Sequence, residues 1–155
     1  MSDKEPTKAL VIRLATPEDI EQIDTLDSFS LSPTRDIHRD MEKYFGSIDP
    51  STHEHTLIFL AEIAGVARAK AELMLPPEDA LQPVGYVKRV VVHPDLRGKG
   101  VAKQLMQHIV AYAHTECKLD AIDLHVWEGN HSAIRLYEAL GFSLQHRELY
   151  YRLRM

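Results

Sequence analysis

The sequence predicts an α/β fold in which a central β-sheet carries helices on both faces. Strand-like apolar runs alternate with helical patterns, and the second half of the chain reads strand–helix–strand. Its 155 residues suit one domain with a core of ordinary size. We expect a polar tail over residues 1–8 and a single folded domain over residues 9–155.

The first part of the chain predicts one strand and two helices. Leu10 to Leu14 form a short apolar run typical of a strand. Thr16 can cap a helix and Pro17 suits its first position, and apolar residues then recur at helical spacing to about Ser28. Asp36 to Phe45 indicate a second, shorter helix.

A hairpin and a third strand follow. Thr56 to Ala61 predict a strand, Ala64-Gly65 a tight turn, and Val66 to Leu75 the returning strand. After a proline-rich loop, Val84 to Val92 are rich in β-formers, and Pro94 should end that strand because proline cannot donate a ladder hydrogen bond.

The last part of the chain continues the alternation. Gly98 to about Glu116 show one apolar face at helical spacing, and Ala121 to Val126 indicate a strand. Asn130 to Leu140 predict a helix stopped by Gly141. We expect Phe142 to Leu153 to form one or two final strands.

Composition excludes several classes of protein. The chain has 23 acidic and 18 basic residues, a net charge of −5, which disfavours a general nucleic-acid binder. A single cysteine, Cys117, excludes a disulfide framework and a multi-cysteine metal site. The first residues lack a signal-peptide pattern and no run approaches 18 apolar residues. We expect a soluble cytoplasmic protein without a nucleic-acid or membrane partner.

The turn after the Val84 to Val92 strand carries the strongest chemical signal. It holds Gly98 and Gly100 and leads directly into a helix, whose free N–H groups can accept an anion. Residues 88–103 contain five basic residues and one acid, a local charge of +4 in a protein of −5. A pyrophosphate is the expected ligand, although such turns also occur for packing alone.

Two phosphate-binding motifs do not fit this turn. The Walker pattern requires Ser or Thr after Gly-Lys, and here Gly100 follows Lys99. The dinucleotide pattern Gly-x-Gly-x-x-Gly fails because Lys103 stands at its third glycine.

The turn resembles the acetyl-CoA signature of the GNAT superfamily of N-acetyltransferases. That signature, Gln/Arg-x-x-Gly-x-Gly/Ala, is met by Arg97, Gly100 and Ala102. Residues 130–142 match a second pattern of the family, Asn-x-x-Ala-x-x-Leu-Tyr-x-x-x-Gly-Phe, at every fixed position. The resemblance covers most of the chain and is weakest across residues 28–55.

The resemblance implies a mixed, mostly antiparallel sheet of six to seven strands, about four helices, and a splayed strand pair at an acetyl-CoA cleft. Acetyl-CoA is implied as co-substrate, with no metal, and a homodimer is left open. The implied cofactor-binding residues are Val90, Val91 and Val92 for the pantetheine arm, Arg97, Gly98, Lys99, Gly100, Val101, Ala102 and Lys103 for the pyrophosphate, and Asn130 and Tyr137.

The same resemblance implies two proton-transfer roles. Tyr137 would be the general acid, since a phenol of pKa about 10 can protonate a departing thiolate of pKa about 8.5. A glutamate base found in some relatives is replaced here by His125, and that of other relatives by Tyr86. His125 is our choice of base, because histidine can accept a proton near neutral pH. Glu72, Asp123 and an ordered water remain alternatives.

Two further patterns bear on ligands. The first helix carries an acidic face, which either borders a cationic amine or is simply solvated; its members are Glu18, Asp19, Glu21, Asp24 and Asp27. The histidine pairs His108/His114 and His125/His131 are six residues apart, a spacing that does not suit one metal-binding helix face.

These observations predict an enzyme that transfers the acetyl group of acetyl-CoA to a primary amine of a small molecule or peptide by direct attack. The alternative of the same fold is a catalytically silent acyl-CoA-binding sensor or regulatory module. A nucleotide-phosphate binder on an unrelated fold is disfavoured by the motif at residues 130–142.

Overall fold

The computed structural model describes residues 9–46 and 55–155, so the tail expected over residues 1–8 lies outside the described residues. The chain divides into two compact units, one ending at His125 and the other comprising Val126–Met155. Each unit is described by itself below.

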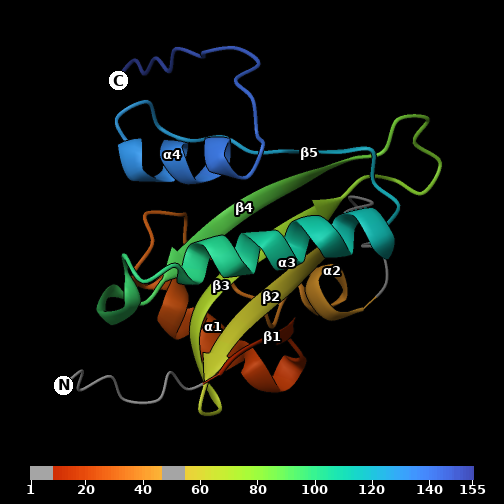
Figure 1. Cartoon of the computed structure of the whole chain (residues 1–155), viewed down its shortest axis with the longest axis vertical. Coiled ribbons are helices and arrows are strands. Elements are labelled where there is room, and N and C mark those ends of the chain that lie inside the picture. The colour runs from red at the N-terminus through yellow and green to blue at the C-terminus, as the bar shows by residue number, and fades with distance from the viewer. Residues whose placement is uncertain (1–8, 47–54) are drawn as a thin grey trace. The chain divides into compact units, whose positions relative to one another are not determined.

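The first unit contains a five-stranded sheet in the order β1-β2-β3-β4-β5 (Figure 1). The three pairings from β1 to β4 are antiparallel, whereas β4 and β5 run parallel. The expected mixed, mostly antiparallel sheet is therefore confirmed, and the expected number of six to seven strands is wrong. The strands are β1 (Leu10–Leu14), β2 (His55–Ile63), β3 (Val66–Leu75), β4 (Val84–Val92) and β5 (Ala121–Asp123).

The missing strands are those expected over Phe142 to Leu153, a segment without regular secondary structure. A strand needs a ladder of hydrogen bonds to a neighbouring strand. The second unit contains one helix, α4 (His131–Ala139), and no strand in its described residues, so an extended segment there has no partner within its own unit. Most side chains of this segment are exposed, including Leu149 and Tyr151.

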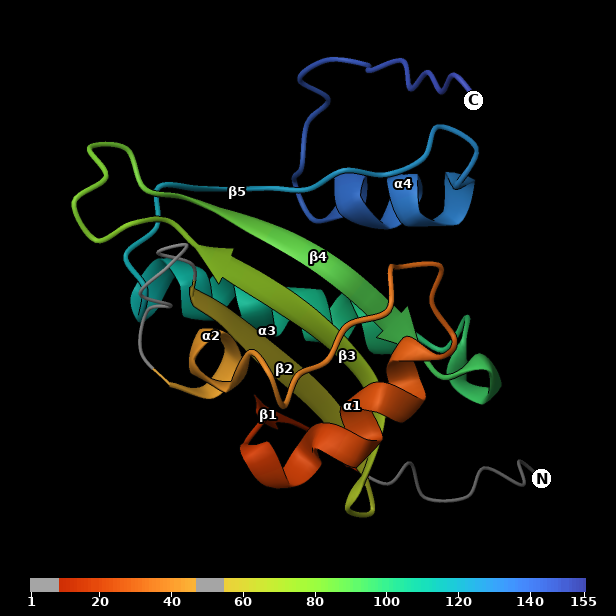
Figure 2. The same cartoon turned by 180° about the vertical axis from the view of Figure 1, so that it is seen from behind.

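Helices cover both faces of the sheet, as expected. α3 (Val101–Thr115) crosses one face (Figure 1), and α1 (Ile20–Asp27) and α2 (Met41–Phe45) lie on the other (Figure 2). A 3₁₀ turn, η1 (Pro17–Asp19), precedes α1, and the Asp19 carboxylate accepts a 2.8 Å hydrogen bond from the Thr16 backbone N–H. α2 is shorter than expected, because residues 37–40 form turns.

Alternation along β2 divides the core between the two faces. Ile58 and Leu60 pack with Ile23 and Leu26 of α1 in one buried cluster. Phe59 points to the other face, where its ring meets the Tyr112 ring of α3 edge-on at 5.2 Å. Period-two alternation of apolar side chains on both faces is typical of a strand buried between helices.

Candidate active site

The parallel pairing of β4 with β5 covers only the start of β4. Val84, Gly85 and Tyr86 lie opposite Ala121, Ile122 and Asp123 in turn. Within the described residues, β4 beyond Tyr86 is therefore paired only with β3. Sequence reasoning missed Gly85, where a Cβ atom would lie 2.7 Å from Leu119 Cδ1. A glycine at that point lets the two strands close over Leu119.

A β-bulge in β4 comprises Arg89 and Val90, the latter being the first of the predicted cofactor-binding valines. Lys70 of β3 lies opposite Val91 and Glu72 opposite Lys88, so Ala71 alone faces Arg89 and Val90. Arg89 has a positive φ of 52°, an unusual conformation for a residue with a side chain. Bulges bend a strand and re-aim its side chains. The bulge therefore reorients the backbone of β4 at Val90, Val91 and Val92.

The strand leads into the glycine turn as predicted. A 3₁₀ turn, η2 (Pro94–Leu96), ends the extended backbone, and Gly98 and Gly100 have φ values of 77° and 78°. The first hydrogen bond of α3 runs from the Gln104 N–H to the Gly100 carbonyl, so the N–H groups of residues 101–103 precede the helical ladder. Arg97, Lys99 and Lys103 are exposed around this helix start. The expected anion-binding elements are thus present together.

The positive charge counted over residues 88–103 does not all belong to this turn. The Arg89 guanidinium donates to the Pro33 carbonyl at 3.0 Å, on the connector between α1 and α2. Arg97 Nε donates to the Val92 carbonyl at 3.2 Å. The Arg89 side chain therefore binds the connector between α1 and α2, whereas the Arg97 side chain binds the end of β4.

The second unit presents Asn130 and Tyr137 on one helix. The Asn130 side-chain oxygen accepts from the Ala133 N–H at 3.3 Å, which is the helix cap expected at the start of α4. Tyr137 lies two helical turns later, and burial raises the pKa of its phenol. Its ring meets Phe142 edge-on at 5.8 Å, and Gly141 ends the helix with a φ of 99°.

The structure brings together Tyr86 and His125, the two positions at which the resemblance led us to look for a base. Tyr86 Oη lies 2.6 Å from His125 Nδ1, and the two rings lie 5.5 Å apart. The sequence singled out both residues separately but gave no sign of this contact, because they stand 39 positions apart.

Glu72, an alternative base in the sequence analysis, belongs instead to a buried charge cluster of Asp27, Arg35, Lys70 and Glu72. Lys70 Nζ lies 2.6 Å from the Glu72 carboxylate and 2.7 Å from that of Asp27. Both terminal nitrogens of Arg35 donate hydrogen bonds to the Glu72 carboxylate, and Arg35 Nη2 lies 3.0 Å from Asp27 Oδ2.

The charges of this cluster balance, and the Glu72 side chain has no exposed surface. Burial alone would raise the pKa of Glu72, but hydrogen bonds and ion pairs from Arg35 and Lys70 hold it below its usual value. The Glu72 carboxylate is therefore engaged in ion pairs with Arg35 and Lys70. An alternating Lys-Ala-Glu within an apolar strand is the sequence signal that could have revealed the cluster.

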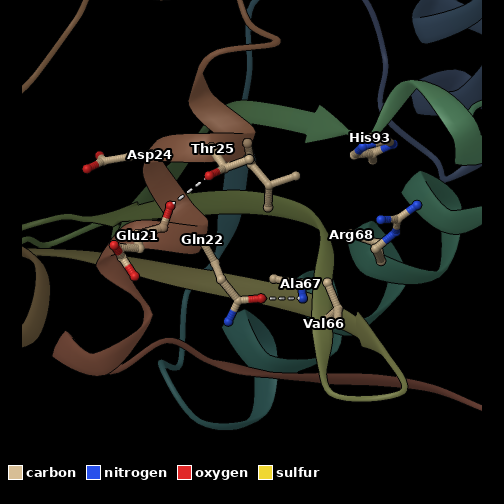
Figure 3. A pocket seen from close by; sticks show the side chains of 9 residues that line it. Glu21, Gln22, Asp24, Thr25, Val66, Ala67, Arg68 and His93 are labelled. Atoms are coloured by element: carbon tan, nitrogen blue, oxygen red, sulfur yellow. Dashed lines mark hydrogen bonds between the residues drawn. The ribbon is translucent and has the colours of Figure 1, made fainter.

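The acidic residues of the first helix divide into two groups. Asp19 is buried against Arg13 and Asp27 belongs to the buried charge cluster, so neither is a solvated surface acid. Glu21 and Asp24 are exposed at a hollow of about 540 Å³ between α1 and the start of β3 (Figure 3). Its other lining residues include Gln22, which accepts from the Ala67 N–H at 2.7 Å, and Arg68 and His93.

Two further observations on the described residues concern metal binding and membrane-spanning helices. Residues 9–46 and 55–155 contain no group of three or more His, Cys, Asp or Glu side chains arranged to hold a metal ion. In the same part of the chain, no helix is both long and apolar enough to cross a membrane.

Sequence comparisons give one family and several relatives. The model of the acetyltransferase (GNAT) family matches residues 18–142. A mycothiol acetyltransferase of Thermobispora bispora is 38% identical over 97 residues, which are 61% of this chain and 32% of that protein. A spermidine N(1)-acetyltransferase of Vibrio cholerae is 34% identical over 64 residues, 38% of this chain and 37% of that protein. This chain therefore spans only about a third of the length of these two relatives.

A longer match and the solved structures agree with this family. N-alpha-acetyltransferase 60 of Xenopus tropicalis is 27% identical over 97% of this chain and 68% of its own length. The structure of AAC(6')-Iy in complex with a CoA-containing bisubstrate analog has a TM-score of 0.72 at 23% identity and covers 95% of this chain and 99% of that one. A transcriptional regulator of Bacillus halodurans reaches the same TM-score at 20% identity, over 94% of this chain and all of that one. At these identities the structural likeness concerns the fold.

Proposed function

Because the chain belongs to the acetyltransferase (GNAT) family, we propose that it transfers the acetyl group of acetyl-CoA to a primary amine by direct attack of the amine on the thioester. One structural observation carries the proposal. Strand β4 is bulged, and beyond Tyr86 it is not paired with β5. It leads into a turn that contains two glycines in the left-handed conformation, the start of α3 and three exposed basic side chains.

Each part of this arrangement suits one part of acetyl-CoA. The pantetheine arm would lie along β4 at Val90, Val91 and Val92, which β5 does not pair, although the Val92 carbonyl already accepts from Arg97 Nε. The pyrophosphate would bind at the start of α3, where N–H groups and the helix dipole favour an anion. Arg97, Lys99 and Lys103 supply fixed positive charge there, and Gly98 and Gly100 let the backbone approach the phosphates.

The family resemblance implies two further contacts with acetyl-CoA, from Asn130 and Tyr137. Asn130 would donate its amide to the pantetheine while its oxygen caps α4. Tyr137 would protonate the departing thiolate. Burial raises the pKa of this phenol, so it carries its proton throughout the neutral range and is ready to act as an acid.

The incoming amine must first lose a proton. An amine of lysine type has a pKa of about 10.4, so only about one molecule in 2,500 is neutral at pH 7. We assign this proton to His125, which is exposed at the end of the β4–β5 pair. After the carbon–nitrogen bond forms, the nitrogen loses a second proton, which balances the one that Tyr137 gives to sulfur.

The acceptor is proposed only as a class, a cationic primary amine. Two of the relatives are named for acetylation at nitrogen, the spermidine N(1)-acetyltransferase and N-alpha-acetyltransferase 60. Glu21 and Asp24 at the hollow beside α1 provide exposed negative charge, which is compatible with a cation.

Binding is tested first, by thermal unfolding with acetyl-CoA and with ATP. A ligand at 100 times its dissociation constant adds roughly 2.7 kcal/mol, and we expect acetyl-CoA alone to give this stabilisation. Turnover is then measured as free CoA thiol released with a polyamine, an aminoglycoside, an amino acid and a peptide with a free N-terminus. Binding without turnover on any amine would favour the silent acyl-CoA-binding module, and stabilisation by ATP alone would contradict both interpretations.

Gly100→Ala tests the turn directly. A residue with a Cβ in the left-handed region costs about 1–2 kcal/mol, so we expect lower stability and roughly tenfold weaker acetyl-CoA binding by calorimetry. Gly65→Ala is the matched control, because Gly65 has a φ of 79° in the β2–β3 turn. It should lose similar stability and bind acetyl-CoA normally. Equal loss of binding in both variants would contradict the role of the Gly100 turn.

A further inference from the structure

Lys70 joins the buried charge cluster to the bulge in β4. Its Nζ atom lies 2.6 Å from the Glu72 carboxylate and 2.7 Å from that of Asp27. The same atom donates a hydrogen bond of 3.3 Å to the backbone carbonyl of Arg89. An ammonium group has three N–H donors and no acceptor, and these oxygens are three in number. Because the Lys70 side chain has no exposed surface, solvent does not compete for the ammonium.

The carbonyl that Lys70 binds belongs to the residue with the unusual backbone conformation in β4. Arg89 is one of the two residues of the bulge that face Ala71, and its φ is 52°. This left-handed conformation is unfavourable for a residue with a side chain, and it persists only where surrounding contacts hold it. A hydrogen bond from a buried ammonium is such a contact, because charged donors make stronger hydrogen bonds than neutral ones.

The side chain of Arg89 is held as well, by the connector between α1 and α2. Its Nη2 atom donates to the Pro33 carbonyl at 3.0 Å. Arg35, two residues further along the same connector, donates to the Glu72 carboxylate of the buried charge cluster. The cluster therefore reaches Arg89 twice, directly through Lys70 and indirectly through the connector.

The bulge lies at the point of β4 that matters for the cofactor. Val90 belongs to the bulge, Val91 lies opposite Lys70, and Val92 follows. In the proposed function these three residues hold the pantetheine arm. A bulge changes the direction of the strand, so the conformation of Arg89 determines how the backbone groups of these residues are oriented.

We propose that Lys70 is a positioning residue for acetyl-CoA: its ammonium holds the Arg89 carbonyl and thereby fixes the bulge that orients the β4 backbone at residues 90–92. This inference rests on the proposed acetyltransferase function. The buried ammonium acts through the strand and does not touch the cofactor. A purely structural Lys70 would only balance the charges of Asp27 and Glu72, and this role can be separated from the positioning role by mutation.

Two double variants remove the ammonium while keeping the charges balanced. Lys70→Met/Glu72→Met leaves Arg35 paired with Asp27, and Lys70→Met/Asp27→Asn leaves Arg35 paired with Glu72. Both lose the hydrogen bond to Arg89. We expect each to bind acetyl-CoA about tenfold more weakly by calorimetry, because the hydrogen bond lost has a charged donor.

Glu72→Gln is the matched control, since it unbalances the cluster but keeps the ammonium and its contact with the Arg89 carbonyl. It should be less stable than the double variants and should bind acetyl-CoA as tightly as the wild type. Wild-type affinity in a folded double variant, or equal weakening in Glu72→Gln, would overturn the inference. Failure of both double variants to fold would also overturn it, because Lys70 would then be required for the fold as a whole.

Amide hydrogen exchange of the free, full-length protein gives a readout that does not depend on acetyl-CoA. NMR measures those amides of residues 90–92 that are protected in the wild type, relative to residues 58–60 of β2. We expect the ratio of the two exchange rates to rise about tenfold in both double variants, because the bulge is held less firmly. An unchanged ratio would contradict the positioning role.

The two proposals fail in distinguishable ways. If the wild type does not bind acetyl-CoA, the proposed function fails, and hydrogen exchange still decides whether Lys70 holds the bulge. If the wild type binds and acetylates an amine while the double variants bind acetyl-CoA equally well, only the positioning role of Lys70 fails.

Discussion

One face of the sheet holds two polar groupings of opposite character. The buried charge cluster has two positive and two negative side chains, Lys70 and Glu72 from β3, Asp27 from the end of α1 and Arg35 from the connector between α1 and α2. The Tyr86–His125 pair begins on the neighbouring strand β4 and joins it to the segment after β5, with His125 exposed. The first grouping is closed and the second is accessible.

This difference distinguishes titratable residues that stabilise the fold from titratable residues that can exchange protons with a substrate or with solvent. A buried carboxylate held by two cations cannot give up its partners without a large loss of stability. An exposed imidazole is a side chain that can exchange a proton near neutral pH. Accessibility therefore favours His125 over Glu72 as the proposed base.

The largest effect is expected from breaking the closed cluster. Glu72→Gln leaves Arg35 and Lys70 with only the Asp27 carboxylate, and removal of one partner from a buried ion pair typically destabilises by about 3–5 kcal/mol. Urea unfolding should report this loss. Glu78→Gln, an exposed glutamate in the loop before β4, is the matched control and should change stability by less than about 0.5 kcal/mol.

A compensated variant keeps this prediction falsifiable. Lys70→Met/Glu72→Met removes one charge of each sign and leaves Arg35 paired with Asp27. Replacement of a whole buried pair by apolar residues is often neutral, so the double variant should recover most of the stability lost in Glu72→Gln. If the double variant were as unstable as the single one, charge balance would not be what stabilises this region.

The open pair should show the reverse pattern. His125→Gln is expected to lower kcat by about 100-fold, at the lower end of the range for general acid–base catalysis. Its stability should fall by less than about 1.5 kcal/mol, since the His125 side chain and its hydrogen bond to Tyr86 are exposed. Steady-state kinetics and urea unfolding of the same preparation measure both. A folded variant with wild-type kcat and an unchanged pH–rate profile would exclude His125 as the base.

The smallest expected effect is a dependence of the free energy of unfolding on pH in the acidic range. The folded pKa of Glu72 is lowered, and so is that of Asp19, chiefly by hydrogen bonds from Arg13. Unfolded glutamate and aspartate bind protons near pH 4.3 and 3.9, so the stability contributed by both groups is present above these values. It is lost as the pH falls through the lower folded pKa values. Between pH 6 and pH 2, the free energy of unfolding should fall less steeply with decreasing pH in Glu72→Gln than in the wild type. An unchanged slope would count against a lowered pKa of Glu72.

Local patterns in the sequence were sufficient for much of the fold. The bounds of β3 and β4 agree with the expected runs, because alternation, the Ala64-Gly65 turn and Pro94 are local signals. The glycine turn and the Asn130 cap also follow from short motifs whose conformations depend on neighbouring residues.

Long-range pairing accounts for what the sequence did not reveal. The bulge at Arg89 depends on the register of β4 against β3, and the Tyr86–His125 contact depends on the pairing of β4 with β5. Arg35 reaches Glu72 from 37 residues away, so no local pattern connects them. Phe142 to Leu153 have the apolar content of strands, but strand formation needs a neighbour that local sequence cannot specify.

The connectivity of the sheet has a consequence for how the fold assembles. β2 and β3 meet across a two-residue turn at Ala64-Gly65, whereas β4 and β5 meet only after the chain has passed through α3. The β4–β5 ladder also spans only three residues of each strand, against five in the β1–β2 ladder, so it is the shortest pairing of the sheet. Local opening of the sheet should therefore begin at β5, and Tyr86 and His125 are among the last partners to meet during folding.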